Sequence, residues 1–294
     1  MIVYYSHGLM CNGLFQYSYL RSFAKPDEKI FCIDGLMGAM KDIDECFDLN
    51  DPNFHFYSPN KVIADIFRLI FFPCIYWLAK IRLFNYVWQI DDCSATSRSG
   101  LIPISVVKTD FFQNEAFFSE HKVRVKVKEI YMQKAMELFN GLPKDRTKVF
   151  VHIRRGDYLK EIYKNDDVTY IVEPTRGINL PISYYNNAIN LIGKEIDSPY
   201  YIFLSDDPEF VEQSFRHISQ ANKYISKNSP IVDFSLMSLC EYGICSNSSF
   251  SWWGSYFMSK KQKVFFPKYW QGWKLREESH PGIQPSWSNV IDVD

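Results

Sequence analysis

The chain has 294 residues, of which 47% are hydrophobic and 17% aromatic, enough for one large domain or two smaller ones. Its 33 basic and 34 acidic residues give a net charge of −1, so no overall field attracts nucleic acid, and an anion-binding site has to be local. The 7 cysteines form no CxxC pair or other zinc spacing, and their odd number favours the reduced cytoplasm over a disulfide framework.

The first half of the chain opens with a β-α-β pattern. The expected elements are a strand at 2–5, a glycine-bearing loop at 7–13, a helix at 14–23, a strand at 29–33, a mixed and largely helical stretch at 34–92, and a strand at 102–107. The chain enters its first strand at once, without the basic and apolar regions of a secretion signal, which indicates a cytoplasmic location.

The most apolar internal stretch covers residues 69–79, between Arg68 and Lys80. It is too short to cross a bilayer, which takes about 20 residues of helix. We expect it to form a buried helix. With Trp77 inside it and Trp88 nearby, the alternative is a helix that lies on the inner membrane surface and makes a peripheral contact there.

Residues 122–128 alternate basic side chains with valine, which by itself is typical of a strand. The continuation at 129–139 has a helical composition, so we expect one long helix, with its basic side chains facing solvent rather than lipid or nucleic acid. Pro143 then marks a boundary, which predicts an N-terminal domain at 1–143 and a C-terminal domain at 144–294.

The C-terminal half alternates strands and helices with short connections, which predicts a parallel sheet with helices on both faces. The expected elements are a strand at 148–153, a polar loop, a helix at 184–196 capped by Ser183, a strand at 200–204, a helix at 208–215, a short strand at 224–225, a helix at 233–241, a strand at 243–245, and a helix from Phe250.

The strand at 148–153 leads into Arg154, Arg155, Gly156 and Asp157. These residues follow the strand's C-terminal end, where open α/β sheets bind ligands. Two guanidiniums at that place suit a diphosphate, which they can hold in bidentate geometry. The run taken alone is explained equally well by an Arg–Asp ion pair that closes a turn.

Two further polar turns follow strands of this half, one with Asp206 and Asp207 and one at residues 246–249. Because the strands are expected to be parallel, the turns should meet at one edge of the sheet. The aspartates could accept from ribose hydroxyls or base N–H groups, and the serines precede a helix whose N-terminus could hold phosphate. Each of these residues, and Asp233, is also explained as a helix cap. Together they describe a nucleotide-diphosphate site without a glycine-rich phosphate loop.

Three segments together resemble the bacterial and animal α-1,2-fucosyltransferases that use GDP-fucose. They are residues 152–158 (HIRRGDY), 233–254 (DFSLMSLCEYGICSNSSFSWWG) and 111–115 (FFQNE). The resemblance covers most of the chain, and the first two strings in this order make a specific combination. It implies an α/β, GT-B-type fold with two Rossmann-like domains facing a cleft. It also implies inversion at the fucose anomeric carbon, GDP-fucose as the donor, and no metal or other cofactor.

The resemblance also implies roles for residues around the donor. Arg154 or Arg155 would neutralise the β-phosphate of GDP, the leaving group, where charge grows in the transition state. His152 would lie beside the pyrophosphate or hold the arginine loop. Asp206 is included among the donor-binding residues because its turn follows a strand and its carboxylate could accept from ribose hydroxyls or base N–H groups.

The downstream segment carries two more implied contacts. Asp233 would accept hydrogen bonds from guanine, and Ser248 or Ser249 would bind phosphate. Asn12, in the N-terminal loop, fits the family pattern and is included among the donor-binding residues.

The general base is less clear from the sequence. An acceptor hydroxyl has a pKa far above neutrality, so a carboxylate or an imidazole should take its proton as attack proceeds. The candidates are Asp157, Glu161 and His7. Asp157 could equally serve to aim the arginines, and Glu161 could be an exposed loop acid.

The N-terminal loop departs from the family pattern. Relatives read GGLGNQ, then Met or Leu, then FQYA, whereas this chain reads HGLMCNGLFQY at residues 7–17. His7 replaces a glycine, one residue is inserted, and Gly13 stands where glutamine is usual, while Gly8, Asn12 and Gln16 fit. The loop therefore leaves the choice of acceptor open, and His7 is either a polar group at the reaction centre or a loop residue without a catalytic role.

These features together predict an inverting transfer of L-fucose from GDP-fucose to the 2-hydroxyl of a galactose. The acceptor would be a free or lipid-linked glycan used for a surface polysaccharide. One alternative is another acceptor, linkage or GDP-sugar within the same superfamily. A second is adhesion or glycan binding without catalysis, through the tripeptide Arg155-Gly156-Asp157, which we disfavour because it follows a strand that should be buried.

Overall fold

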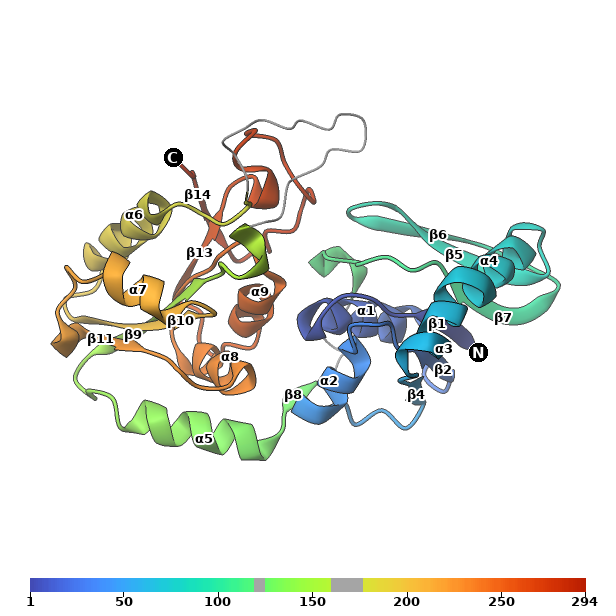
Figure 1. The fold of residues 1–294 in the computed structure, drawn as a ribbon, viewed down its shortest axis with the longest axis horizontal. Coiled ribbons are helices and arrows are strands. Elements are labelled where there is room, and N and C mark those ends of the chain that lie inside the picture. The colour runs from blue at the N-terminus through green and yellow to red at the C-terminus, as the bar shows by residue number, and fades with distance from the viewer. Residues whose placement is uncertain (119–124, 160–176) are drawn as a thin grey trace. The chain divides into compact units, whose positions relative to one another are not determined.

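The computed structural model describes residues 1–118, 125–159 and 177–294. The chain forms two compact units (Figure 1): Met1–Lys128 with Pro281–Ile283, and Glu129–His280 with Gln284–Asp294. Each unit contains a six-stranded sheet. The boundary expected after Pro143 differs from this division because helix α5 (Glu129–Asn140) packs against α8 (Pro230–Leu239) of the second unit.

The sheet of the first unit has the order β4-β2-β1-β7-β5-β6. Its strands are β1 (Ile2–Tyr5), β2 (Ile30–Ile33), β4 (Phe54–Tyr57), β5 (Phe84–Asp91), β6 (Ser94–Arg98) and β7 (Ile102–Val107). All neighbouring strands are parallel except β5 and β6, which form an antiparallel hairpin. The helices are α1 (Met10–Phe23), α2 (Ala39–Cys46), α3 (Lys61–Ile66) and α4 (Phe72–Lys80), with a π-helical segment at Phe67–Phe71 between the last two.

A buried carboxylate fixes the strand ends of the first unit. Asp34 follows β2 and accepts from the hydroxyls of Ser6 and Ser58, at 2.8 Å each. It also accepts from the backbone N–H groups of Met40 and Lys41, at 3.1 Å each, in the first turn of α2. Because Ser6 follows β1 and Ser58 follows β4, this one side chain ties three strand ends to a helix N-terminus.

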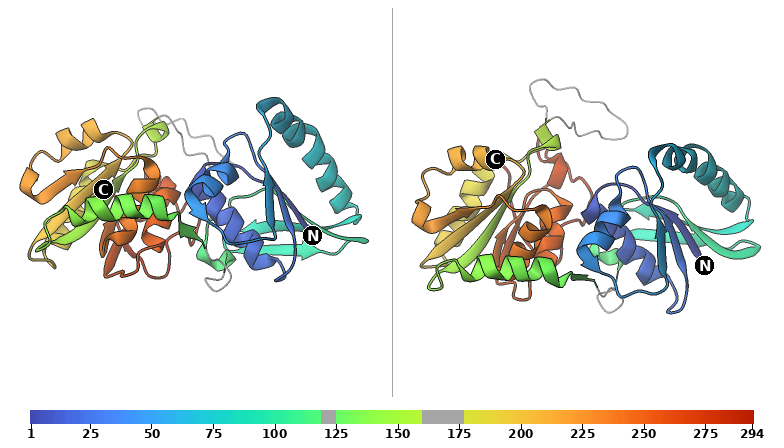
Figure 2. Two further views of the ribbon diagram at one scale, coloured as in Figure 1. Left: turned by 90° about the horizontal axis from the view of Figure 1, so that it is seen from below. Right: turned by 60° about the horizontal axis from the view of Figure 1, so that its bottom comes forward.

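The expectation of a buried helix at residues 69–79 is wrong. A helix of 20 residues runs over Lys61–Lys80, its most apolar window has a mean hydropathy of 1.8, and only 17% of that window is buried. By length and composition it could cross a membrane, and it is the one such helix in the described part of the chain. It instead packs along the sheet (Figure 2), where Ala79 joins Tyr86 and Val106 in a buried cluster.

The expectation of one long helix from residue 122 is also wrong over the residues that the structure describes. Lys126–Val127 forms strand β8, which pairs antiparallel with β3 (Phe47–Asp48), and α5 begins only at Glu129. Val127 is buried opposite Phe47, so the alternating pattern, not the helical composition beyond it, decides this segment. Residues 119–124 lie outside the described ranges.

The second unit has an all-parallel sheet in the order β11-β10-β9-β12-β13-β14, as the alternating pattern predicts. Its strands are β9 (Thr147–Ile153), β10 (Pro199–Ser205), β11 (Lys223–Ile225), β12 (Tyr242–Ile244), β13 (Lys263–Pro267) and β14 (Asn289–Ile291). Besides α5 and α8, its α-helices are α6 (Ile182–Gly193), α7 (Pro208–Ser214) and α9 (Ser249–Tyr256).

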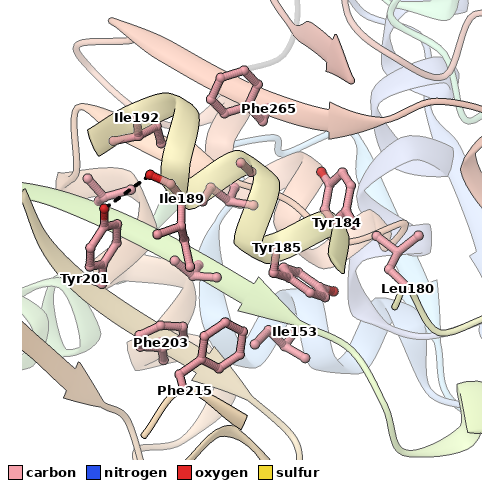
Figure 3. Close-up of a cluster of buried hydrophobic side chains, with 14 of the residues drawn as sticks. Ile153, Leu180, Tyr184, Tyr185, Ile189, Ile192, Tyr201, Phe203, Phe215 and Phe265 are labelled. Atoms are coloured by element: carbon pink, nitrogen blue, oxygen red, sulfur yellow. Dashed lines mark hydrogen bonds between the residues drawn. The ribbon is translucent and has the colours of Figure 1, made fainter. Parts of the chain in front are cut away.

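Helices cover both faces of this sheet, as expected. On one face, Tyr184, Tyr185 and Ile189 of α6 pack with Ile153 of β9 and Phe215 after α7 (Figure 3). Side chains alternate along a strand, so the neighbour of Ile153 points to the opposite face. That neighbour is His152, and its ring lies 5.2 Å from the ring of Phe250 in α9.

One expected helix cap is wrong. Helix α6 begins at Ile182, and its N-cap residue is Pro181, which makes no side-chain hydrogen bond to the helix. Ser183 therefore lies inside the helix, and its hydroxyl donates to the backbone carbonyl of Asp294 at 2.6 Å. Proline is favoured at helix starts because its fixed φ suits the entry and the position needs no N–H donor.

Candidate active site

The polar turns of the second unit lie at one edge of its sheet. Strands β9, β10 and β12 run parallel and adjacent, so the turns that follow them leave the sheet on the same side. The hydroxyl of Ser205 donates to the carbonyl of Ile153 at 2.8 Å and accepts from the N–H of Asp207 at 3.0 Å. These bonds hold the β9 and β10 turns together.

Arg154 lies between two carboxylates in this edge. Its Nη2 is 2.6 Å from Oδ1 of Asp157, and its Nη1 is 2.8 Å from Oδ2 of Asp206. The guanidinium carbon also lies 5.5 Å from the centre of the Tyr158 ring. The side chain remains 26% exposed, so its position is fixed while part of it still faces solvent.

Arg155 is held by the other aspartate of the β10 turn. Its Nε lies 3.0 Å from Oδ2 of Asp207, and its guanidinium carbon is 3.4 Å from the centre of the Phe210 ring, a cation–π contact. Its backbone N–H donates to Oδ1 of Asp206 at 2.9 Å. Asp207 also caps α7 by accepting from the N–H of Phe210 at 3.0 Å. An arginine held in this way is poorly presented for the adhesion function considered above.

Gly156 leaves room in the turn for the carboxylate of Asp206. A Cβ at this position would lie 2.6 Å from Oδ2 of Asp206, closer than real Cβ contacts. The turn thus brings Arg154, Arg155 and Asp157 next to Asp206 and Asp207 of the β10 turn, as expected for polar turns that meet at one edge of the sheet. Both arginines are paired with aspartates. The ion-paired turn that the sequence analysis gave as an alternative is therefore present in the structure.

His152 links the arginine turn to the β12 turn. The residue is buried, and its Nδ1 lies 2.9 Å from the hydroxyl oxygen of Ser246. Burial, and then the positive charge of Arg154, lower the pKa of the imidazole to about 3. The ring is therefore neutral at physiological pH, and its geometry suits holding the loop in place.

The β12 turn leads directly into α9. The hydroxyl of Ser248 accepts from the N–H of Phe250 at 3.3 Å, an N-cap, and Ser249 is the first helical residue. The side-chain amide of Asn247 donates to the carbonyl of Ile178 at 2.7 Å, while its buried Oδ1 has no hydrogen-bond partner among the described residues. A helix N-terminus at the edge that carries two arginines favours anions.

Asp233 lies in the first turn of α8, in a small buried network. The hydroxyl of Ser226, just after β11, donates to its Oδ1. The amide of Asn228 donates to Ser226 Oγ at 2.8 Å and to the hydroxyl of Tyr224 at 3.0 Å. Burial raises the pKa of Asp233 to about 7, and the hydrogen bonds from Ser226 and Asn228 act against that rise.

Ser226 and Asn228 belong to the network around Asp233, and the sequence analysis did not single them out. They follow a strand end, as the other polar turns do, and that position is the signal that could have identified them. Strand β11 has only three residues, so its end is less marked in the sequence than that of β9 or β10.

The N-terminal loop forms a second polar cluster, within the first unit. The side chain of Gln16 bonds both the N–H of His7, at 3.2 Å, and its carbonyl, at 2.7 Å. The Asn12 side chain accepts from Gln113 at 2.8 Å. Gly8 has φ of +84°, and a Cβ there would lie 2.6 Å from Nδ2 of Asn12. The residues that fit the family pattern therefore shape this loop.

The imidazole of His7 packs edge-on against the ring of Phe111, with 4.0 Å between the ring centroids. Its Nδ1 is buried without a hydrogen-bond partner in the described ranges. Burial lowers the pKa of His7, and the nearby charge of Asp110 opposes this. His7 is thus favoured in its neutral form, which can accept a proton.

Glu161, one of the candidate bases, lies outside the described residues, so its role stays a prediction. Among the described residues, no group of three or more His, Cys, Asp or Glu side chains is placed to hold a metal ion.

Known sequences resemble this chain over much of its length. The model of glycosyl transferase family 11 matches residues 103–289. An alpha-1,2-colitosyltransferase of Escherichia coli is 30% identical over 198 residues, which cover 62% of this chain and 64% of that protein. The O-antigen biosynthesis glycosyltransferase WbnK, also of Escherichia coli, is 33% identical over 125 residues, or 41% of this chain and 38% of that one. The matches span less than two thirds of either relative.

Solved structures show the same fold at low sequence identity. A glycosyl transferase family 9 protein from Veillonella parvula aligns with a TM-score of 0.56 at 11% identity, over 99% of this chain and 86% of that one. The NodZ alpha-1,6-fucosyltransferase, co-crystallised with GDP, aligns with a TM-score of 0.52 at 11% identity, over 90% and 93%. These likenesses confirm the expected α/β fold of the GT-B type. The chain therefore belongs to glycosyl transferase family 11, the α-1,2-fucosyltransferase family.

Proposed function

We propose that the protein is a cytoplasmic enzyme that transfers L-fucose from GDP-fucose to the 2-hydroxyl of a galactose. The acceptor is a free or lipid-linked glycan of a surface polysaccharide such as O-antigen, and the transfer inverts the anomeric carbon without a metal. The observation that carries the proposal is the pair Arg154 and Arg155, held at the ligand-binding edge of a parallel sheet in a family 11 chain.

The arginines supply charge where the leaving group develops it. As the bond from fucose to GDP breaks, negative charge accumulates on the β-phosphate, and preorganised donors there stabilise the transition state. Asp206 and Asp207 preorganise the two guanidiniums through contacts of 2.8 and 3.0 Å. The N-terminus of α9, with Ser248 and Ser249, adds backbone donors for the diphosphate.

Asp233 is assigned to guanine, whose N1 and N2 groups donate two hydrogen bonds. A carboxylate accepts both only when it is ionised. Because burial raises the pKa of Asp233 to about 7, this assignment makes nucleotide binding sensitive to pH. His152, neutral and bonded to Ser246, keeps the arginine turn in position.

Of the candidate bases that the structure describes, we assign the role to His7. Its imidazole is favoured in the neutral form, which can accept a proton, whereas the carboxylate of Asp157 already contacts the guanidinium of Arg154 at 2.6 Å. His7→Gln is expected to lower kcat by about 10²- to 10⁴-fold. The affinity for GDP should not change, and a loss of GDP affinity equal to the loss of kcat would contradict the assignment.

The activity is tested by incubating the protein with GDP-fucose and a panel of galactosides, including lactose. We expect GDP release above the rate of donor hydrolysis, and an α-1,2 linkage in the product by NMR. Arg155→Ala should lower the rate of release about 10²- to 10³-fold, whereas Arg216→Ala, a change of an exposed arginine in the same unit, should leave it unchanged. If no galactoside raises GDP release, the acceptor assignment is wrong.

GDP-colitose is the alternative donor, because a relative of 30% identity is named a colitosyltransferase. Colitose is fucose without its 3-hydroxyl. A site that hydrogen-bonds this hydroxyl rejects the deoxy sugar by about 10⁴-fold or more, because its polar groups are left unpaired. Comparing kcat/KM for GDP-fucose, GDP-colitose and GDP-mannose decides between the donors.

A further inference from the structure

The helix over Lys61–Lys80 presents a row of apolar side chains to solvent. Their exposed fractions are Val62 70%, Ile66 50%, Leu69 63%, Ile70 60% and Trp77 60%. The spacing of three, four or seven residues between most of them is that of one helix face. We call this set the apolar row.

The opposite side of the same helix is fixed to the first unit. Phe72 and Ala79 are buried, and the hydroxyl of Tyr76 pairs with that of Thr109 at 2.8 Å, next to the strand β7. Helix α4 packs against β5 and β7 (Figure 2). A helix that crossed a bilayer would have to give up this packing, so the geometry favours a helix that lies parallel to a surface.

The row continues beyond the helix end. Ile81 is 55% exposed, and Leu101, at 86%, is the most exposed of the large apolar side chains described. The N–H of Leu101 donates to the carbonyl of Arg82 at 2.9 Å, which brings the backbone of Leu101 to the residue that follows Ile81. Large exposed apolar patches in soluble units mark sites of interaction.

The charges around the row are positive. Between residues 61 and 82 the chain carries Lys61, Arg68, Lys80 and Arg82, and its one acid is Asp65, which pairs with Arg68 at 2.9 Å. The whole chain has a net charge of −1, so this excess is local. Cations on either side of an exposed tryptophan and leucine complement the phosphates of an anionic lipid surface.

We propose that the apolar row, with Ile81 and Leu101, seats the protein on an anionic membrane surface. The apolar side chains enter the boundary between headgroups and acyl chains, Trp77 lies at headgroup level, and the lysines and arginines contact lipid phosphates. A second copy of the chain is the other possible occupant. Pairing two identical rows would bring their cations together, which disfavours that arrangement.

The experiment is flotation of the full chain with vesicles of phosphatidylcholine, with and without phosphatidylglycerol. We expect binding that needs the anionic lipid and weakens with salt. Leu69→Gln with Trp77→Gln should lower the vesicle affinity at least about tenfold. The matched control is Ile130→Gln with Met136→Gln on α5, two apolar helix positions that are 57% and 46% exposed, and it should bind as the unchanged protein does.

A second pair of variants removes charge and leaves every apolar contact in place. Lys61→Gln with Lys80→Gln should reduce binding to anionic vesicles about fivefold for each cation, without affecting the melting temperature. This pair decides the proposal if the Leu69 and Trp77 variant fails to fold. GDP binding in solution should be unchanged in all variants, which separates this proposal from the proposed transfer activity.

Three results would overturn the proposal. They are no flotation with anionic vesicles, equal flotation of the control and the apolar-row variant, and a concentration-dependent dimer that the apolar-row variant abolishes while vesicles are not bound. The last result would assign the surface to contacts between copies of the chain.

Discussion

Asp233 gives the protein a pH-dependent stability that one substitution can isolate. Burial raises the pKa of its carboxyl to about 7 in the folded state. In the unfolded chain the same group titrates near its ordinary value of about 3.9. The folded state therefore holds the proton more tightly, so the contribution to stability is full below about pH 4 and is lost as pH rises through 7.

The size of the effect follows from the two pKa values. Between pH 5.5 and 8 the loss is about 2 kcal/mol, because each pKa unit corresponds to about 1.4 kcal/mol. Asp233→Asn keeps the shape of the side chain but does not titrate. The free energy of unfolding of the wild type minus that of the variant should therefore fall by about 2 kcal/mol over this range.

The assay is urea unfolding at several pH values, followed by tryptophan fluorescence. Trp252, Trp253 and Trp270 are buried in the second unit and report on its unfolding. Asp197→Asn, at an exposed position, is the matched control. A difference between wild type and Asp233→Asn that stays flat or rises with pH would refute the raised pKa.

The same ionisation carries into nucleotide binding if Asp233 accepts from guanine. The affinity for GDP should weaken about tenfold for each pH unit below 7, because a proton has to leave the carboxyl before the nucleotide binds. Titration calorimetry at pH 5.5, 6.5 and 7.5 measures this slope. An affinity that does not vary with pH would place the guanine elsewhere.

Four further outcomes follow from the arginine edge. Arg155→Ala should lower kcat about 10²- to 10³-fold with the fold retained. Arg155→Lys should retain only part of the wild-type rate, since a lysine cannot make the bidentate contact of a guanidinium. Equal rates for lysine and arginine at this position would contradict the proposed contact with phosphate. Gly156→Ala places a Cβ 2.6 Å from Oδ2 of Asp206 and should weaken GDP binding, measured by calorimetry. His152, with its pKa lowered to about 3, contributes stability above pH 6.5 that is lost on acidification. Relative to His152→Gln, the loss between pH 6.5 and 5 should be about 1.5 kcal/mol in urea unfolding. Asp157→Asn should raise the affinity for GDP by removing a competing negative charge, and an unchanged or lower affinity would count against the competition.

The strands that carry the site could be predicted because they are buried on both faces. Residues 149–151 and 200–204 are continuous apolar runs within these strands, and the polar residues that follow the strands stand out for that reason. The sequence predicts that the aspartate turn meets the arginine turn, but not which aspartate pairs with Arg154 and which with Arg155. These pairings depend on β10 lying next to β9, and the order of strands in a sheet cannot be predicted from a single sequence.

The helix over Lys61–Lys80 shows a different limit. Its composition indicates a helix, yet a core helix and a surface helix of this kind have the same apolar content. What distinguishes them is which side chains meet the sheet, and only Ala64, Phe72 and Ala79 are buried there. The expectation of burial followed the average behaviour of apolar residues, and an exposed apolar row is the informative exception to it.

The arginine edge contains more carboxylates than guanidiniums, and the way each aspartate is held decides how a diphosphate can bind. Asp206 also accepts the backbone N–H of Arg155, and Asp207 also caps α7, so both are fixed by bonds other than the ion pairs. Asp157 is the most exposed of the three carboxylates, at 47%. An exposed pair of this kind is worth about 1 kcal/mol or less, whereas a phosphate offers Arg154 a bidentate, charge-assisted contact. A diphosphate therefore competes with Asp157 and not with Asp206 or Asp207. Under the proposed function, two of the aspartates aim the arginines, and Asp157 is the one whose contact with Arg154 the donor would replace.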